Sequence, residues 1–132
     1  MKIVLTATIF VLLAAGCGEE DTESRITVIE ETGLIDERDP TDNNYGGYRY
    51  DSYSFHTNPL DQVTVEIDAE GFQPILSLHE VSTEAHLAEW DSEYSEEPAL
   101  NYRIAGGGEI EARVYAPGGT GSYTVKITVT GN

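Results

Sequence analysis

Few side chains in this 132-residue chain could carry out covalent chemistry. Nucleophilic catalysis needs a serine or cysteine beside an oriented base, and the chain has one cysteine, Cys17, and three histidines, His56, His79 and His86. No HExxH or comparable metal-binding spacing links the histidines, and we expect them at solvent-facing strand ends. The acids are numerous, but no pair of them stands out for glycoside hydrolysis. We therefore predict that the chain is not an enzyme, and a small hydrolase is the least favoured alternative.

Two acidic loops, at residues 36–44 and 91–97, could supply oxygen ligands to a cation. Calcium takes six to eight oxygens from carboxylates and carbonyls. Neither loop has the spacing of an EF-hand, and a solvated turn is the alternative for both. Alternate carboxylates on one turn can converge, so the first loop supplies the candidate calcium ligands, Asp36, Asp39 and Asp42.

Aromatic side chains offer a second kind of candidate site. Tyr48 and Tyr50 alternate with polar residues and, by strand parity, lie opposite Tyr53 and Phe55, which we expect in the core. Flat aromatics on a β surface suit stacking on sugar rings or packing on another protein. The alternative is that a segment of the chain itself covers these tyrosines. The candidate ligand-binding residues are Tyr48, Tyr50, Trp90 and Tyr94.

The first sixteen residues have the pattern of an export signal. Lys2 is followed by an uncharged run that is too short to span a membrane as a helix. The run ends in Leu13-Ala14-Ala15-Gly16-Cys17, which resembles the lipobox of bacterial lipoproteins. That resemblance implies cleavage before Cys17 and attachment of acyl chains to its thiol, and Gly18 after the cysteine favours the outer membrane where the source has two membranes.

Charge excludes one class of partner. The chain has 7 Lys and Arg against 24 Asp and Glu, a net charge of −17. Removing residues 1–16 removes Lys2 and no acid, so the mature chain would carry 6 − 24 = −18. Nucleic-acid affinity comes largely from cations that neutralise phosphates, so we expect no nucleic-acid partner. Residues 17–24, GEEDTES after the cysteine, contain too little apolar surface to fold and are predicted to be a tether.

From residue 25 onward, apolar residues recur with a period of two. This alternation is typical of strands with one buried and one wet face, and clusters of Gly, Pro, Asn and Asp separate them. The sequence thus predicts one all-β domain at 25–132, an antiparallel, jelly-roll-like β-sandwich of seven or eight strands. Residues 81–88 could form a helix or a hairpin loop. The predicted strands are 26–29, 48–55, 63–67, 75–78, 88–90, 100–104, 110–114 and 123–129.

Several short motifs follow one another in this domain. Asp51, Tyr53 and Phe55 form a D-x-Y-x-F strand, and Asp51 at its start could accept backbone N–H bonds. The other motifs are Gly33-Leu34, QVTVEID, GFQPILSL and GTGSYTVKITV.

In order and spacing, these motifs resemble the bacterial pre-peptidase C-terminal domain, a small β-sandwich carried by secreted hydrolases and other exported proteins. The resemblance covers residues 25–130 and implies an accessory, non-catalytic module. Two positions depart from the family. Gln73 stands where Asp is common, which weakens a calcium site in that loop, and Gly108-Glu109-Ile110-Glu111 replaces a Gly-Thr-Tyr-Tyr strand.

The sequence therefore predicts a lipid-anchored binding or accessory module of the cell envelope, attached to the membrane through Cys17. Its expected partner is an extracellular polysaccharide, peptidoglycan or an envelope protein. A structural or assembly lipoprotein that supports a membrane protein complex is the alternative.

Overall fold

The structure, a computed structural model, describes residues 8–14 and 24–131. Every regular element in these ranges is a strand, apart from one short 3-10 turn, η1 (Asn43–Tyr45). The strands are β1 (Thr8–Ala14), β2 (Ser24–Ile35), β3 (Thr41–Asp42), β4 (Tyr48–Thr57), β5 (Gln62–Glu70), β6 (Ile75–Glu80), β7 (His86–Asp91), β8 (Leu100–Arg103), β9 (Gly108–Ala116) and β10 (Gly121–Gly131).

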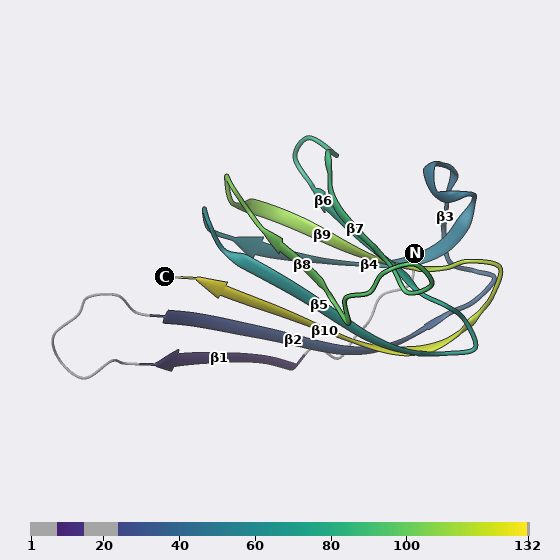
Figure 1. Cartoon of the computed structure of the whole chain (residues 1–132), viewed down its shortest axis with the longest axis horizontal. Helices are drawn as coiled ribbons and strands as arrows, with labels where there is room; N and C mark the ends of the chain where they lie inside the picture. Colours follow the sequence, from purple (N-terminus) through teal and green to yellow (C-terminus); the bar gives the residue numbers. More distant parts are fainter. Residues whose placement is uncertain (1–7, 15–23, 132) are drawn as a thin grey trace, which may run out of the picture.

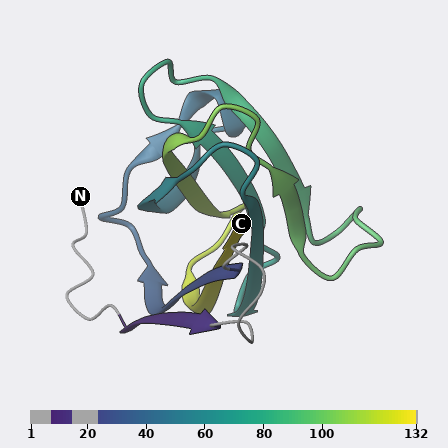
Figure 2. The same ribbon diagram turned by 90° about the vertical axis from the view of Figure 1, so that its left-hand side faces the viewer.

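The strands form two antiparallel sheets that pack face to face (Figures 1 and 2). Sheet A has the order β1-β2-β10-β5-β8, and sheet B has the order β3-β4-β9-β6-β7. The predicted all-β sandwich is confirmed, and each of the eight predicted segments contains a strand. The sequence did not predict β3, because a two-residue strand has no periodicity.

Alternation of side chains builds the core. The inward residues of β10 and β5, in the middle of sheet A, face those of β9 and β6 in sheet B. Burial of this apolar surface is the main stabilising contribution to such a sandwich. The fully buried members include Val63, Val65, Leu76, Leu78, Ile110, Val114, Val125 and Ile127.

A hydrogen bond between buried polar groups joins the two sheets. The Tyr123 hydroxyl of β10 donates to Asp51 Oδ2 of β4 at 2.7 Å, and Tyr53 contacts the same hydroxyl. Gly33 of β2 lies under the Tyr123 ring, and a Cβ at this position would overlap the ring. The Tyr123 hydroxyl is thus one donor to Asp51, for which the sequence suggested backbone N–H donors.

The remaining segments fall outside or at the margin of the sandwich. Residues 81–85 form the turn of the β6–β7 hairpin, as the hairpin alternative predicted. β1 pairs with β2 and lies within the predicted removable leader, so β2 would become an edge strand after cleavage. Cys17 and most of the predicted tether lie outside the described residues. Across residues 8–14 and 24–131, no helix has the length and apolar character needed to cross a membrane.

Candidate functional site

The outer face of sheet B carries many polar and aromatic side chains from β4, β6, β7 and β9. Register places outward residues in rows across four strands, so that Arg113 lies between Ser52 on β4 and Ser77 on β6. The adjacent row places Tyr115 beside Tyr50. Because all these side chains point away from the core, another segment or solvent must cover them.

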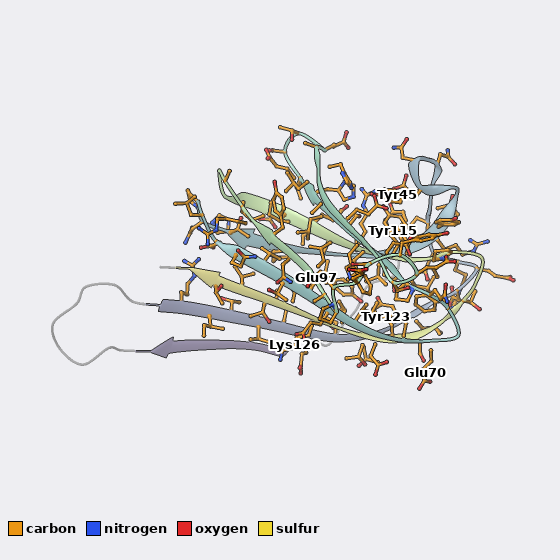
Figure 3. The ribbon with its side chains drawn as sticks, viewed as in Figure 1. Tyr45, Glu70, Glu97, Tyr115, Tyr123 and Lys126 are labelled. Atoms are coloured by element: carbon orange, nitrogen blue, oxygen red, sulfur yellow. The ribbon has the colours of Figure 1, made fainter. Side chains whose placement is uncertain are left out.

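Residues 42–47 fold over this face. The Asp42 carboxylate caps η1 by accepting from the Asn44 N–H at 2.9 Å. Gly46 and Gly47 follow with φ of 60° and 72°, conformations that glycine adopts without steric cost. The turn lays the Tyr45 ring on Tyr115, with centroids 4.4 Å apart and an interplanar angle of 22°. Figure 3 shows the two rings together on the outer side of sheet B. Tyr115 is therefore fully buried although it points away from the core.

Arg113 contacts two carboxylates and an aromatic ring on this face. Its Nη1 lies 2.8 Å from Asp42 Oδ2, its Nε contacts Glu111, and its guanidinium lies 4.8 Å from the centroid of the Tyr50 ring. The Tyr115 hydroxyl donates to the same Asp42 oxygen at 2.8 Å. Burial by itself would raise the pKa of Asp42, but the hydrogen bonds and the Arg113 charge outweigh it and lower that pKa. The Arg113–Asp42 ion pair thus holds η1 against the outer face of sheet B.

The histidines of β6 and β7 complete the site. His79 and His86 meet edge to face, with ring centroids 5.3 Å apart. The His86 Nε2 lies 2.7 Å from the Tyr45 hydroxyl, and the His79 Nε2 lies 2.7 Å from Ser77 Oγ. Burial, together with the charges of Arg113 and His86, lowers the pKa of His79, so that its neutral form is favoured. The prediction of solvent-facing histidines holds for His56 and His86, whereas His79 is buried.

A groove of about 660 Å³ opens between η1 and the β6–β7 hairpin. Its floor is Tyr45, Arg113 and the histidine pair, and its rim carries the exposed acids Glu84 and Glu89. Arg113 is compensated by Asp42, so the accessible charge of the groove is negative. Such a groove suits a cationic side chain that also stacks on an aromatic ring.

The three predicted calcium ligands do not come together. Asp36 pairs with Arg38 at 2.9 Å, Asp39 accepts from the backbone N–H of Asp36 at 2.8 Å, and Asp42 is held by Arg113. Among the residues that the structure describes, no group of three or more His, Cys, Asp or Glu is arranged to hold a metal ion. Asp42 instead belongs to the groove.

The four predicted aromatic residues are spread over three places. Tyr50 packs beside Tyr115, and Tyr48 is half-buried on the same face of β4. Trp90 packs against the core, and its indole N–H donates to the Glu97 carbonyl at 2.8 Å, so it is not a free stacking surface. Tyr94 is 78% exposed, on the loop after β7.

Sequence reasoning missed most of the groove. Arg113, Ser77 and Glu89 sit on three different strands and become neighbours through register alone. Tyr45 lies in a turn, and no periodic pattern in the sequence indicates that its ring stacks on Tyr115. The one available signal was the row of outward residues on 111–115, in which an arginine lies between one acid and one aromatic residue.

Comparison with known proteins yields a likeness in fold. No protein-family model and no curated protein matches the chain, and the resemblance to pre-peptidase domains stays a prediction.

Among solved structures, the chain resembles PliG of Aeromonas hydrophila, with a TM-score of 0.56, 12% identity, and coverage of 77% of this chain and 85% of that one. PliG of Salmonella Typhimurium matches with a TM-score of 0.51 and 23% identity, and a PliG mutant of Escherichia coli with 0.52 and 20%; each match covers 77% of this chain and 86% of the other. These three are periplasmic lysozyme inhibitors of g-type lysozyme. At such identities the likeness shows a shared β-sandwich fold.

Proposed function

We propose that this chain is a lipid-anchored, non-enzymatic binding module of the bacterial cell envelope whose partner is a protein. The observation that carries the proposal is the aromatic-floored, acid-rimmed groove on the outer face of sheet B, with Tyr45 and His86 at its floor. A groove with this charge favours a basic partner, and the net charge of −17 would speed the encounter.

The fold likeness supports a specific class of partner. The matched proteins inhibit g-type lysozyme, and the match covers most of both chains. A g-type lysozyme is therefore the first partner to test, with the acidic groove as the docking surface. Cleavage of the leader and acylation of Cys17 would place the module in the envelope, where a cell-wall-cleaving enzyme acts.

A hydrolase has less support. Ser77 and His79 are within hydrogen-bond distance, but Ser77 is 1% exposed and lies beneath the groove floor. A substrate carbonyl cannot approach a hydroxyl that is covered in this way, and the lowered pKa of His79 is explained by burial and neighbouring charges without catalysis. The Ser77–His79 contact is thus structural.

Polymer adhesion is also less favoured. A sugar-binding surface needs several aromatic rings that are free to stack together. Here Tyr50 is packed against Tyr115, Trp90 donates to the Glu97 carbonyl, and Tyr94, although 78% exposed, lies elsewhere on the loop after β7. A structural lipoprotein that supports a membrane complex differs from the proposal in needing one stoichiometric membrane partner, which cross-linking in cells would identify.

Inhibition of a purified g-type lysozyme on peptidoglycan tests the proposal, with the Cys17→Ser protein as the inhibitor. We expect inhibition that the double variant Glu84→Lys, Glu89→Lys weakens roughly tenfold or more at low salt. The matched control reverses Glu66 and Glu70, two exposed acids on the outer face of sheet A, and should retain inhibition.

Each outcome separates the candidate functions. Equal loss in both double variants would indicate non-specific charge attraction and would contradict the groove as the docking surface. Absence of inhibition, together with co-sedimentation of the protein with peptidoglycan alone, would favour polymer adhesion over a protein partner.

A further inference from the structure

One end of the sandwich differs in charge from the rest of this acidic molecule. At this end β2 begins, β10 ends, and the β4–β5 loop turns; it faces the viewer in Figure 2. A groove of about 560 Å³ opens there. Among the described residues that line it, two are arginines and none is an acid. The lining residues are Arg25, Ile26, Pro59, Leu60, Gln62, Arg103, Thr130 and Gly131.

Leu60 is the exposed apolar residue of this end. It is 65% exposed and has a φ of 69°, a left-handed conformation that disfavours side chains with a Cβ. Its N–H donates to the Ile104 carbonyl at 2.6 Å, and the N–H of Ile104 donates back to the Asp61 carbonyl at 2.8 Å. Glycine or asparagine would fit such a turn with less strain. Neither turn geometry nor packing accounts for a leucine here; the backbone hydrogen bonds fix the turn, and the side chain faces solvent.

Asp61 fixes both the loop and Arg25. Its carboxylate, 2% exposed, accepts from the Asn58 N–H at 2.8 Å and pairs with Arg25 at 2.6 Å. The acid is therefore below the surface, and the Arg25 side chain remains one-third exposed. Arg103 is exposed at the end of β8. Together, Arg25, Leu60 and Arg103 form what we call the basal patch.

The predicted anchor leads to the same end. Eight positions separate Cys17 from Arg25, and eight residues can span at most about 29 Å when fully extended. An acylated Cys17 would thus keep the basal patch within reach of the headgroups, whereas Asp42 and Tyr45 lie toward the other end of the sandwich (Figures 1 and 3).

We infer that the basal patch docks on an anionic phospholipid surface, with Leu60 inserted between headgroups and Arg103 against their phosphates, while Arg25 stays paired with Asp61 at the edge of the contact. The inference rests on the proposed lipid anchor. Cations near an anionic leaflet and a buried apolar side chain both favour the bound orientation. Tethering raises the local concentration of the surface, so that a weak contact is enough to orient the domain. Docking in this way leaves the acidic groove turned away from the membrane and open to a protein partner.

Fluorescence on vesicles tests the docking independently of acylation in cells. The full-length protein is coupled through the thiol of Cys17, its one cysteine, to a maleimide lipid. Vesicles of brominated phosphatidylcholine, with or without phosphatidylglycerol, serve as the quenching surface. The Leu60→Trp variant reports on the basal patch, and Tyr94→Trp, at a site that is also exposed, is the matched control. Emission of the parent, which contains Trp90, is subtracted from both.

We expect stronger quenching and a blue shift for Leu60→Trp on phosphatidylglycerol vesicles, and neither for Tyr94→Trp. Adding Arg103→Glu should lower the docking equilibrium roughly tenfold or more at low salt, because it changes two charge units near the surface. Equal quenching of the two reporters, or quenching that is independent of phosphatidylglycerol and Arg103, would overturn the inference. Acyl labelling of Cys17 in cells, compared with Cys17→Ser, tests the anchor separately.

Discussion

The outer faces of the two sheets start from the same sequence pattern and end in different environments. On sheet A, Lys126 of β10 lies opposite Glu30 on one side and Glu66 on the other, and all three side chains are exposed. On sheet B, Arg113 also lies opposite polar neighbours, yet its side chain is 23% exposed and Tyr115 beside it is fully buried.

The difference comes from a covering segment. Residues 42–47 fold over sheet B and bring Asp42 and Tyr45 onto it, whereas the outward residues of β10 and β5 in sheet A meet solvent. Alternation thus tells which side chains point away from the core, and the path of a distant loop decides whether solvent or protein meets them. Surface ion pairs contribute little to stability, while a pair that is partly removed from water is costly to break.

Replacing Arg113 on sheet B and Lys126 on sheet A by methionine measures how much the covering segment adds to the contribution of a cation to stability. We expect Arg113→Met to lower the free energy of unfolding by about 2–4 kcal/mol, because Asp42 and Glu111 keep their charges in a partly buried place. The matched variant Lys126→Met should change the free energy of unfolding by less than about 0.5 kcal/mol. Urea denaturation followed by circular dichroism measures both values. Similar losses for the two variants would show that the covering segment does not shield Arg113.

Removing the Tyr115 hydroxyl tests how much its hydrogen bond to Asp42 stabilises the packing of η1 on sheet B. Tyr115→Phe leaves the ring under Tyr45 and deletes its hydrogen bond to Asp42, so we expect a loss of about 1–2 kcal/mol in the free energy of unfolding. Tyr94→Phe removes an exposed hydroxyl and should have no measurable effect. If both variants unfold at the parent's urea midpoint, the Tyr115–Asp42 hydrogen bond contributes nothing net.

Acid should weaken the outer site selectively. The pKa of Asp42 is lowered in the folded protein, so its ionised form stabilises the fold above the ordinary value of 3.8, and this contribution is lost as pH falls through the lowered pKa. The penalty of Asp42→Asn should therefore be largest at neutral pH and shrink in acid. Unfolding curves of parent and variant between neutral pH and the acid limit give the comparison, and a penalty independent of pH would contradict the assignment.

Glu31 should show a smaller effect with the opposite sign. It is 4% exposed on the inward side of β2, its Oε2 has no hydrogen-bond partner in the described part of the chain, and burial raises its pKa. Its folded form retains the proton longer than the unfolded form, so stability falls as pH rises above the ordinary 4.5. We expect Glu31→Gln to stabilise the protein by less than about 1 kcal/mol at neutral pH, and this gain should vanish in acid. A gain that persists below the ordinary pKa would point to packing as its cause.

Glu31 also bears on the edge of sheet A. An inward charge on an edge strand disfavours pairing with other chains, and β2 would become an edge strand if the predicted leader were cleaved together with β1.

The sequence predicted much of the fold and little of the site. Alternation in 63–67, 110–114 and 123–129 located the central strands, because a one-residue slip there would expose the whole apolar face. The site depends on pairs such as Asp42–Arg113 and Tyr45–His86, 71 and 41 positions apart, and local patterns carry no information at such separations. Trp90 shows the converse, since an aromatic beside an acidic loop looks exposed in the sequence and packs at the edge of the core.

By itself, the sequence determined the class of fold and the set of inward residues, because both follow from a period of two along the chain. It also determined the strong negative charge and the position of Cys17, which are read directly from the residues. Tertiary structure alone decided that a turn at 43–45 covers Tyr115, that Arg113 and Asp42 pair beneath it, and that Leu60 stands beside two arginines. These neighbours are set by strand register and loop paths, and the physical reason is that the energies that fix them arise only when distant segments are packed together.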